Sequence, residues 1–315
     1  MRKTNFKFAV LLCSIAILSC TSADKNKNQI SFSGAFALYP LNIKWSEEYK
    51  KLHPETSFNI QAGGAGKGLT DALTGNADVG MFSRELNEAE LSKDVWYIAL
   101  AKDAVLPVVN ASNPFIDLLK KNGLTHDQFE NIFINNTPPT WNELLNRPNI
   151  TPQKINIYTR SDASGAAESW AAFFNAHQEN LKGLAVLGDP GVAHAVQDDS
   201  NGIGFNNTHY VYDTKTGAKL KNIEVLPLDI NSNGTIDSTE NFYNNLDELL
   251  NAVLAGKYPS PPVRDLYFVC KQKPTDKAIL DYFKWVLTDG QQFVKSSGFV
   301  PLPQNEINAS LKKLE

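Results

Sequence analysis

Short β-like runs alternate with amphipathic helical runs through the first half of the chain, and this alternation constrains the fold more than any other feature. Gln29 to Ser33 reads as a strand, Pro40 to Leu52 as a helix with its apolar residues on one side, and Ser57 to Gln61 as the next strand. A short helix around Leu69 to Leu73 and a strand from Ala77 to Met81 follow. This βαβ rhythm predicts a parallel sheet covered by helices.

A second unit of the same kind lies further along the chain. It begins with a strand at Ile155 to Tyr158, continues through a helix around Ala166 to Ala176, and reaches another strand at Asn201 to Phe205. A strand at Arg264 to Cys270 and a helix at Asp276 to Leu287 come late in the chain. We therefore expect two α/β lobes, with the second inserted into the first.

Two extended runs mark the expected crossovers between these lobes. They are Ala104 to Asn110 and Ile223 to Leu228. We expect lobe 1 to consist of residues 29–108 and 225–315, and lobe 2 of residues 109–224. The alternative is a second crossover near Tyr258 to Phe268.

The N-terminus has the pattern of a targeting segment. A basic start precedes an apolar stretch, Phe8 to Leu18, that is shorter than the ~20 residues a membrane span needs. Ile17 to Cys20 resembles a bacterial lipobox, which predicts a lipoprotein signal peptide over residues 1–19, acylation of Cys20, and a flexible tether over residues 20–28. The protein would then be anchored by lipid on the periplasmic side of a bacterial membrane. The alternative is an ordinary signal peptide cut a few residues later.

The charge balance argues against nucleic acid as a partner. Of the 30 Lys and Arg residues, Arg2, Lys3 and Lys7 would leave with the signal peptide, so 27 remain against 34 Asp and Glu, a formal net charge of −7. Cys270 would be the one cysteine left in the mature chain without a lipid. No internal disulfide is then possible.

Three loops share one design, in which a strand ends, glycines or small polar residues follow, and a helix begins. They are Ser33 to Ala35, Gly63 to Gly66, and Ser161 to Gly165. Glycine lets the backbone approach a ligand closely, and the first turn of a helix offers free N–H groups to an oxyanion. A nucleotide P-loop is excluded at the second loop, because Gln61 and Gly68 stand where that motif needs a glycine and a hydroxyl.

These loops lie in segments that resemble the periplasmic phosphate-binding proteins of high-affinity phosphate ABC transporters. The resemblance covers residues 33–86, the loop RSDASGAAESW at residues 160–170, and the later motifs NGIGF, YPSPPVRDLYF and GFVPLP. It implies a two-lobed type II periplasmic binding-protein fold, each lobe a mainly parallel sheet flanked by helices, with the ligand cleft between the lobes. It further implies a monomer that captures phosphate and delivers it to an ABC transporter permease.

In that family phosphate is held by hydroxyls, helix-start N–H groups, an arginine and usually a carboxylate. Carried over by matching motif, the resemblance implicates Ser83, Arg84, Arg160, Asp162, Ser164 and Gly165. Arginine suits this role because its planar fork donates two parallel bonds to one anion. Asp162 is the expected acceptor for the proton of HPO₄²⁻, with Glu85 behind it.

The chain departs from the family pattern where side-chain hydroxyls are usual. The first loop reads Ala35, Phe36, Ala37, the second has Ala65, and Ala166 follows Ser-Gly in the third. These positions remain candidates for contact with the anion through their backbone. A hydrogen bond to a charged partner contributes roughly 1.5–3 kcal/mol, so three losses could weaken phosphate binding by ~10³-fold or more without compensation. Changed anion specificity, or a signalling or surface role with little ligand binding, are the alternatives.

A periplasmic phosphatase is a weaker alternative, and we do not expect an enzyme. The five histidines, His53, His126, His177, His194 and His209, are scattered without metal-ligand spacing. Ser164 is flanked as Asp-Ala-Ser-Gly-Ala, which is not the Gly-x-Ser-x-Gly elbow of a serine hydrolase. No organic cofactor is expected.

One further motif lies outside these loops. The twelve residues from Asp229 to Glu240 match the EF-hand calcium loop at every coordinating position. The expected ligands of a structural Ca²⁺ are Asp229, Asn231, Asn233, Thr235, Asp237 and Glu240. Residues 241–254 read as the exiting helix, whereas the segment before the loop looks extended, so only half an EF-hand is expected. The alternative is an Asn/Asp-rich turn whose carboxylates are solvated.

Overall fold

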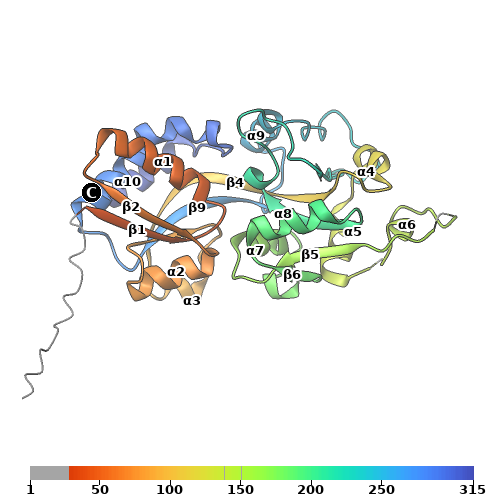
Figure 1. Cartoon of the computed structure of the whole chain (residues 1–315), viewed down its shortest axis with the longest axis horizontal. Coiled ribbons are helices and arrows are strands. Elements are labelled where there is room, and N and C mark those ends of the chain that lie inside the picture. Colours follow the sequence, from red (N-terminus) through yellow and green to blue (C-terminus); the bar gives the residue numbers. More distant parts are fainter. Residues whose placement is uncertain (1–27, 138, 150) are drawn as a thin grey trace, which may run out of the picture.

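Two α/β lobes lie side by side and form an elongated molecule in the computed structural model (Figure 1). The structure describes residues 28–137, 139–149 and 151–315; the predicted signal peptide, Cys20 and residues 20–27 of the predicted tether lie outside them. The strands are β1 (Gln29–Gly34), β2 (Ser57–Ala62), β3 (Val79–Phe82), β4 (Trp96–Asn110), β5 (Asn156–Arg160), β6 (Leu184–Val186), β7 (Gly202–Asn207), β8 (Ile223–Val225) and β9 (Val263–Cys270).

Helices cover both faces of the strands. The α-helices are α1 (Tyr39–Leu52), α2 (Ala65–Thr74), α3 (Glu88–Leu91), α4 (Ile116–Asn122), α5 (His126–Glu130), α6 (Trp141–Leu144), α7 (Gly165–Ala172), α8 (Gly188–Asp198), α9 (Leu246–Leu254), α10 (Lys277–Leu287) and α11 (Gln304–Leu314). Shorter 3₁₀ or π turns are η1 (Asn131–Asn135), η2 (Gln178–Asn180), η3 (Thr208–Tyr210), η4 (Asp289–Phe293) and η5 (Lys295–Ser297). Among the described residues no helix is long and apolar enough to cross a membrane.

Strand pairing confirms the predicted two-lobed α/β fold. The order is β2-β1-β3-β9-β4-β7-β5-β6, with β8 beside β4. In the first lobe β2, β1 and β3 are parallel, and in the second β7, β5 and β6 are parallel. The two long strands β4 and β9 pair antiparallel with each other and join the lobes. Each lobe is therefore a mainly parallel sheet closed by antiparallel strands.

The hydrophobic cores divide along β4. Its residues up to Ala101 pack in the first lobe with Trp45 of α1, whereas its residues from Ala104 pack in the second lobe with Trp170 of α7. The chain returns from the core of the second lobe, which contains Tyr258, to the core of the first lobe, which contains Leu266. β4, which is 15 residues long, contributes to both cores because its two halves pair with different neighbours.

This packing departs from the second boundary expected at residue 225. β8 pairs with the second half of β4, and Leu249 and Tyr258 are buried in the second core. Residues 225–258 therefore pack with the second lobe. We propose that the second crossover lies between Tyr258 and Phe268, the alternative position, because long-range pairing of β8 holds the segment there.

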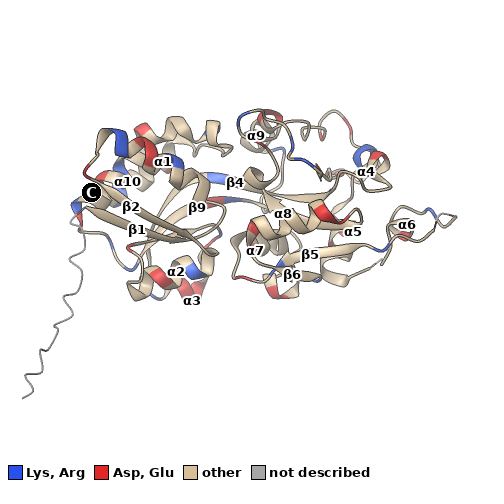
Figure 2. Cartoon of the chain, viewed as in Figure 1, with Lys and Arg blue, Asp and Glu red and all other residues tan. Residues whose placement is uncertain are grey.

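Local sequence explains the elements that carry the site. α1 starts with Pro40 in its first turn and buries Leu41, Trp45 and Tyr49, as its apolar spacing predicts. The strand predicted at residues 104–110 is only the second half of β4, because residues 96–103 form its other half beside β9. In Figure 2, basic and acidic residues are interspersed along the helices of both lobes, and no basic stripe crosses the drawn face.

Candidate functional site

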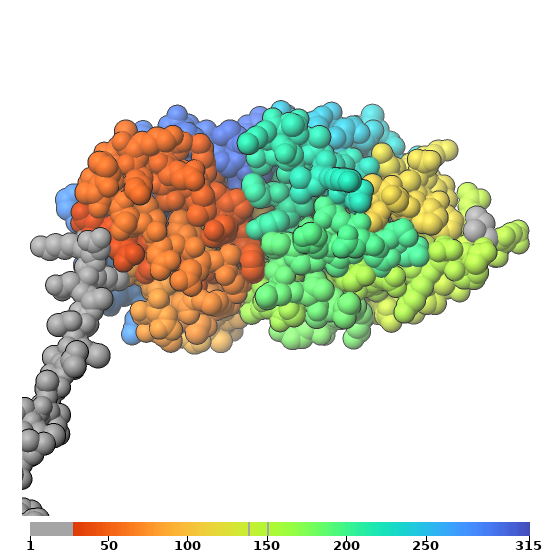
Figure 3. Space-filling view, in the orientation of Figure 1, coloured from red at the N-terminus to blue at the C-terminus, as the bar shows by residue number. Residues whose placement is uncertain are grey.

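The three predicted loops converge where the lobes meet. They surround a narrow space between the lobes, lined by Ala35, Phe36, Ala37, Gly64, Ala65, Ser83, Arg160, Ser164, Gly165, Ala166, Asp189 and Asn207. We call this the inter-lobe cavity. In the space-filling view the lobes meet along a continuous junction in the middle of the molecule (Figure 3). The cavity lies at this junction between the lobes.

Direct contacts between the lobes enclose this cavity. The Gly66 N–H donates to the Ala163 carbonyl at 3.0 Å, and the Tyr210 hydroxyl donates to the Phe36 carbonyl at 3.3 Å. Gly165 lies so close to Ser83 that a Cβ at this position would overlap the Ser83 carbonyl oxygen. Glycine at residue 165 is required by this close approach rather than by its backbone angles.

Helix starts supply backbone donors around the cavity. α2 begins at Ala65 after Gly64, and α7 begins at Gly165 after Ser164, whose Oγ accepts from the Ala167 N–H at 3.2 Å. Within the described residues, the N–H groups of Phe36, Ala37, Ala65, Gly165 and Ala166 have no protein acceptor. Such groups at helix starts can bind an anion.

Arg160 provides the buried positive charge of the cavity. Its Nε and Nη2 donate to Asp162 at 2.9 and 2.7 Å, and its Nη1 lies 2.8 Å from Asp189 Oδ2. Its guanidinium also lies over the Phe36 ring, 5.5 Å from the centroid. Burial alone would lower the pKa of Arg160, but the carboxylates of Asp189 and Asp162 raise it. Arg160 therefore stays charged, at the start of the loop where the sequence placed it.

Asp189 is a carboxylate in the cavity that the sequence reasoning missed. Its side chain is 2% exposed, and its Oδ1 accepts from Asn207 Nδ2 at 2.6 Å. It lies in the first turn of α8, and Asn207 ends β7. The signal was present as Gly188-Asp189, a fourth place where a glycine and a small polar residue begin a helix.

A second buried pair lies behind Asn207. Asp103 of β4 and Arg264 of β9 face each other in strand register, and Arg264 also donates to Asn207 Oδ1. Burial raises the pKa of Asp103 to about 6 even though Arg264 acts to lower it. Burial likewise lowers the pKa of Arg264, against the opposing effect of Asp103. The strands that join the lobes are thus linked to the cavity through Asn207.

Three predicted residues lie outside the cavity lining. Both Asp162 oxygens accept from Arg160, so this carboxylate positions the arginine. Arg84 forms two bonds with Glu90, at 2.7 and 2.6 Å, and Glu85 accepts from the Tyr267 hydroxyl at 2.7 Å. The predicted residues that do line the cavity are Ala35, Phe36, Ala65, Ser83, Arg160, Ser164, Gly165 and Ala166.

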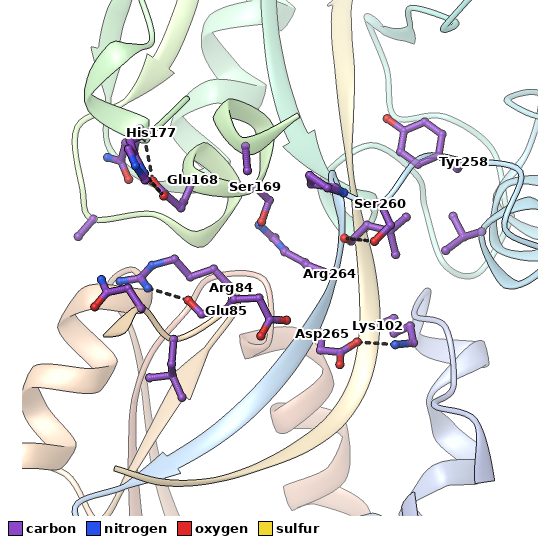
Figure 4. A pocket seen from close by; sticks show the side chains of 18 of the residues that line it. Arg84, Glu85, Lys102, Glu168, Ser169, His177, Tyr258, Ser260, Arg264 and Asp265 are labelled. Carbon is purple, nitrogen blue, oxygen red and sulfur yellow. Dashed lines mark hydrogen bonds and ion pairs between the residues drawn. The ribbon is translucent and has the colours of Figure 1, made fainter. Parts of the chain in front are cut away.

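A larger groove of about 1140 Å³ lies beside the cavity, along the strands that join the lobes (Figure 4). Its charged side chains include Arg84, which pairs with Glu90, and Lys102, which pairs with Asp265 at 2.6 Å. On the other lobe Glu168 accepts from His177 at 2.8 Å. The cavity is the stronger candidate for an anion, because helix-start N–H groups without protein acceptors surround it.

Among the described residues, side chains that could hold a metal occur at two places. His126, Asp127 and Glu130 bring possible ligand atoms within 4.8 Å of one another on α5. However, His126 Nε2 lies 2.9 Å from the Phe173 carbonyl, and that contact already uses one ring nitrogen. The second place is the predicted calcium loop, in which the buried carboxylates Asp229 and Glu240 are both present.

A family profile and curated relatives match most of the chain. The profile of the PBP superfamily domain matches residues 21–289. A phosphate-binding protein PstS of Xylella fastidiosa is 28% identical over 312 residues, covering 90% of this chain and 84% of the relative. A phosphate-binding protein PstS of Pseudomonas aeruginosa is 27% identical over 330 residues, covering 97% and 93%.

Solved structures share the fold. One is a putative phosphate ABC transporter substrate-binding protein with bound phosphate from Clostridium perfringens, with a TM-score of 0.70 and 21% identity, covering 88% of this chain and 100% of that one. Another is the phosphate-bound periplasmic protein PfluDING, with a TM-score of 0.65 and 14% identity, covering 89% and 92%. At these identities the likeness establishes the two-lobed fold.

Proposed function

The chain belongs to the PBP superfamily, and on that premise we propose that it is a solute-binding protein whose inter-lobe cavity captures a small oxyanion, phosphate first, for an ABC import system. The observation that carries this proposal is the position of Arg160, which is buried between two lobes beside helix starts with free N–H groups.

We propose that backbone donors replace the missing hydroxyls. The N–H groups of Ala65, Gly165 and Ala166 stand at the starts of α2 and α7, where the helix dipoles favour an anion. Ser83 and Ser164 are the hydroxyl-bearing side chains of the cavity lining. Backbone groups are held by the helices themselves, so they need little reorganisation on binding.

Asp189, rather than the expected Asp162, is the proposed acceptor for the ligand's proton. Asp189 lines the cavity, whereas Asp162 lies outside its lining. A carboxylate beside an anion repels it unless the two share a proton. HPO₄²⁻ and singly protonated phosphonates carry such a proton and sulfate does not, so the cavity favours the protonated anions.

Calorimetry on ligand-stripped protein tests the function. Phosphate should bind saturably and more tightly than sulfate or small carboxylates. Arg160→Ala should abolish binding, because it removes the buried charge of the cavity and leaves two carboxylates unpaired. Arg160→Lys keeps the charge but loses the planar fork, so it should bind phosphate at least tenfold more weakly than the wild type. This variant decides the test if Arg160→Ala does not fold.

Arg84→Ala is the matched control, because Arg84 pairs with Glu90 outside the cavity lining and its loss should leave affinity within about threefold of the wild type. Wild-type affinity for phosphate in Arg160→Lys would overturn the proposal. Tight binding of another anion with no phosphate binding would favour the alternative of changed specificity. No binding of any tested anion would favour the ligand-poor signalling or surface role.

We propose binding without turnover. Ser164 Oγ caps α7 by accepting from the Ala167 N–H, and none of the described histidines lines the cavity. A serine nucleophile would need an adjacent general base to accept its proton. Hydrolysis of a phosphomonoester that survives repurification and falls in Ser164→Ala would contradict this.

We further propose that the protein is a monomer held on the periplasmic side of the membrane through lipid on Cys20. The support is the apolar Phe8 to Leu18 run that ends at Cys20. Cys20→Ser should release the protein from membranes, and mass spectrometry should find an acylated N-terminal cysteine in the wild type. An unmodified mature N-terminus beyond Cys20 would support the ordinary signal peptide instead.

A further inference from the structure

Buried carboxylates in this protein are paired with basic side chains, with two exceptions that lie in one loop. Within the described residues, the buried acidic side chains are Glu90, Asp103, Asp189, Glu224, Asp229 and Glu240. Glu90 pairs with Arg84, Asp103 with Arg264, Asp189 with Arg160, and Glu224 with Lys120 and Lys219. Asp229 and Glu240 have no basic side chain within ion-pair distance among these residues.

The two exceptions are deeply buried. Asp229 is 2% exposed and Glu240 is 3% exposed, and their hydrogen-bond donors are main-chain N–H groups. Burying an ionised carboxylate is costly unless a positive charge compensates it, either a basic side chain or a metal ion. Within the described residues the protein supplies no such side chain here, so a bound cation is the charge that could compensate them.

These two residues are the first and last positions of the twelve-residue loop that matches an EF-hand. Glu240 Oε1 accepts from the N–H groups of Ile230 and Asn231 at 2.9 and 3.0 Å, which brings the end of the loop back to its beginning. The Asn231 side chain donates to Asp237 Oδ2 at 3.0 Å, which joins the middle positions. The oxygen-bearing side chains of the pattern therefore come from one closed loop.

The loop is also fixed to the rest of the second lobe. The Asp229 N–H donates to the Leu124 carbonyl at 2.9 Å, and the Ile236 N–H donates to the Lys121 carbonyl at 2.9 Å. Ile236 packs so closely against Gly123 that a Cβ on Gly123 would overlap the Ile236 side chain. Gly234 has a φ of 82°, which suits the sharp turn that the EF-hand pattern assigns to glycine.

We propose that the loop from Asp229 to Glu240 binds one Ca²⁺ ion. The ligands are side-chain oxygens of Asp229, Asn231, Asn233, Asp237 and Glu240 and the carbonyl oxygen of Thr235. Three carboxylates offset the charge of the ion, and the hard oxygen donors suit calcium in preference to zinc or copper. The proposal does not rest on the nature of the anion in the inter-lobe cavity.

The role of the ion is structural. The predicted exiting helix over residues 241–254 begins only at Leu246, because Asn245 caps it, so the loop lacks the directly attached helix of a sensing EF-hand. Instead the loop connects Leu228, which bridges to Leu124, with the buried Phe242 and Tyr243. Calcium would fasten the segment between β8 and α9 onto α4.

Calcium titration of the full-length mature protein tests the site. Isothermal titration with CaCl₂ should give one site, with a dissociation constant in the ~10⁻⁴–10⁻³ M range of extracellular modules. The melting temperature should be higher with 10 mM CaCl₂, about tenfold above the weaker end of that range, than with a chelator. A wild-type protein with no saturable calcium binding and no change in melting temperature would overturn the proposal.

Two loop variants and one control assign the binding to this loop. Glu240→Gln, and Asp237→Asn at a half-buried position, should each weaken calcium binding at least tenfold. The control is Asp247→Asn, which removes a carboxylate from the exposed first turn of α9 and should bind calcium like the wild type. Asp237→Asn serves if Glu240→Gln does not fold, which circular dichroism would reveal. Unchanged calcium binding in a folded loop variant, or equal loss in Asp247→Asn, would place the ion elsewhere and contradict the assignment.

Discussion

Arg160 and Asp189 form an ion pair at 2.8 Å in which each side chain is 2% exposed. The arginine ends β5 and the aspartate lies in the first turn of α8, so the pair joins two loops of the second lobe at the cavity. Such a pair is costly to bury unless its remaining hydrogen-bonding groups are satisfied. Here Asp162 accepts from the other arginine nitrogens, and Asn207 donates to the second aspartate oxygen.

Asp189→Asn should reduce the discrimination between phosphate and sulfate. The variant removes the carboxylate that repels an unprotonated anion while keeping a group of the same shape, so sulfate should gain at least tenfold relative to phosphate. Competition calorimetry with both anions measures this ratio. Asp198→Asn, at the exposed end of the same helix, is the control. An unchanged ratio in Asp189→Asn would rule out Asp189 as the proton acceptor.

Ala166→Thr should raise phosphate affinity by restoring a side-chain donor in the first turn of α7. A hydrogen bond to a charged group contributes roughly 1.5–3 kcal/mol, or about 10- to 100-fold in affinity. Titration with phosphate gives the gain, and the melting temperature reports any strain at this buried position. Ala172→Ser adds a hydroxyl at the other end of α7 and should leave affinity unchanged. No gain, with tighter binding of another anion, would indicate changed specificity.

Gly165→Ala should prevent the lobes from meeting across the cavity. The added methyl group would overlap the Ser83 carbonyl on the opposite lobe, so phosphate affinity should fall at least tenfold and the radius of gyration by X-ray scattering should increase. Gly191→Ala is the control, because its Cβ would stay 3.6 Å from the nearest atom on Val186. Normal affinity and compactness in Gly165→Ala would mean that binding does not require this contact.

The contribution of Asp103 to the free energy of unfolding should fall as pH rises from about 4 to 6. Burial raises the pKa of Asp103 to about 6 from 3.8, so the folded protein holds the proton more tightly than the unfolded chain does. The stability from this group is present below pH 4 and is lost as pH rises towards 6. The loss amounts to about 3 kcal/mol at most, from a shift of roughly two units.

Urea unfolding of wild type and Asp103→Asn across pH 4 to 7 isolates this contribution, because the other titrating groups cancel in the difference. The free energy of unfolding of the wild type minus that of the variant should fall over this range. A difference that stays constant with pH would show that Asp103 titrates normally in the folded protein.

The three loops that line the inter-lobe cavity were predictable because their signals are local. A glycine-rich junction between strand and helix creates free N–H groups wherever it occurs, so Ala65, Gly165 and Ala166 could be named from the sequence. Arg160 was identified in the same way, from its place in the Ser-Gly loop. Arg84 lies outside the cavity lining and pairs with Glu90, a local ion pair that the motif does not reveal.

By itself, the sequence determined the α/β rhythm, the anion-binding loop design and the EF-hand pattern, because each depends on residues close together in the chain. Only the tertiary structure decided that Asp189 joins Arg160, that β8 carries residues 225–258 into the second lobe, and that Asp229 and Glu240 are buried without a basic partner. These facts depend on which distant segments pack together, and burial then fixes the energy of each charge.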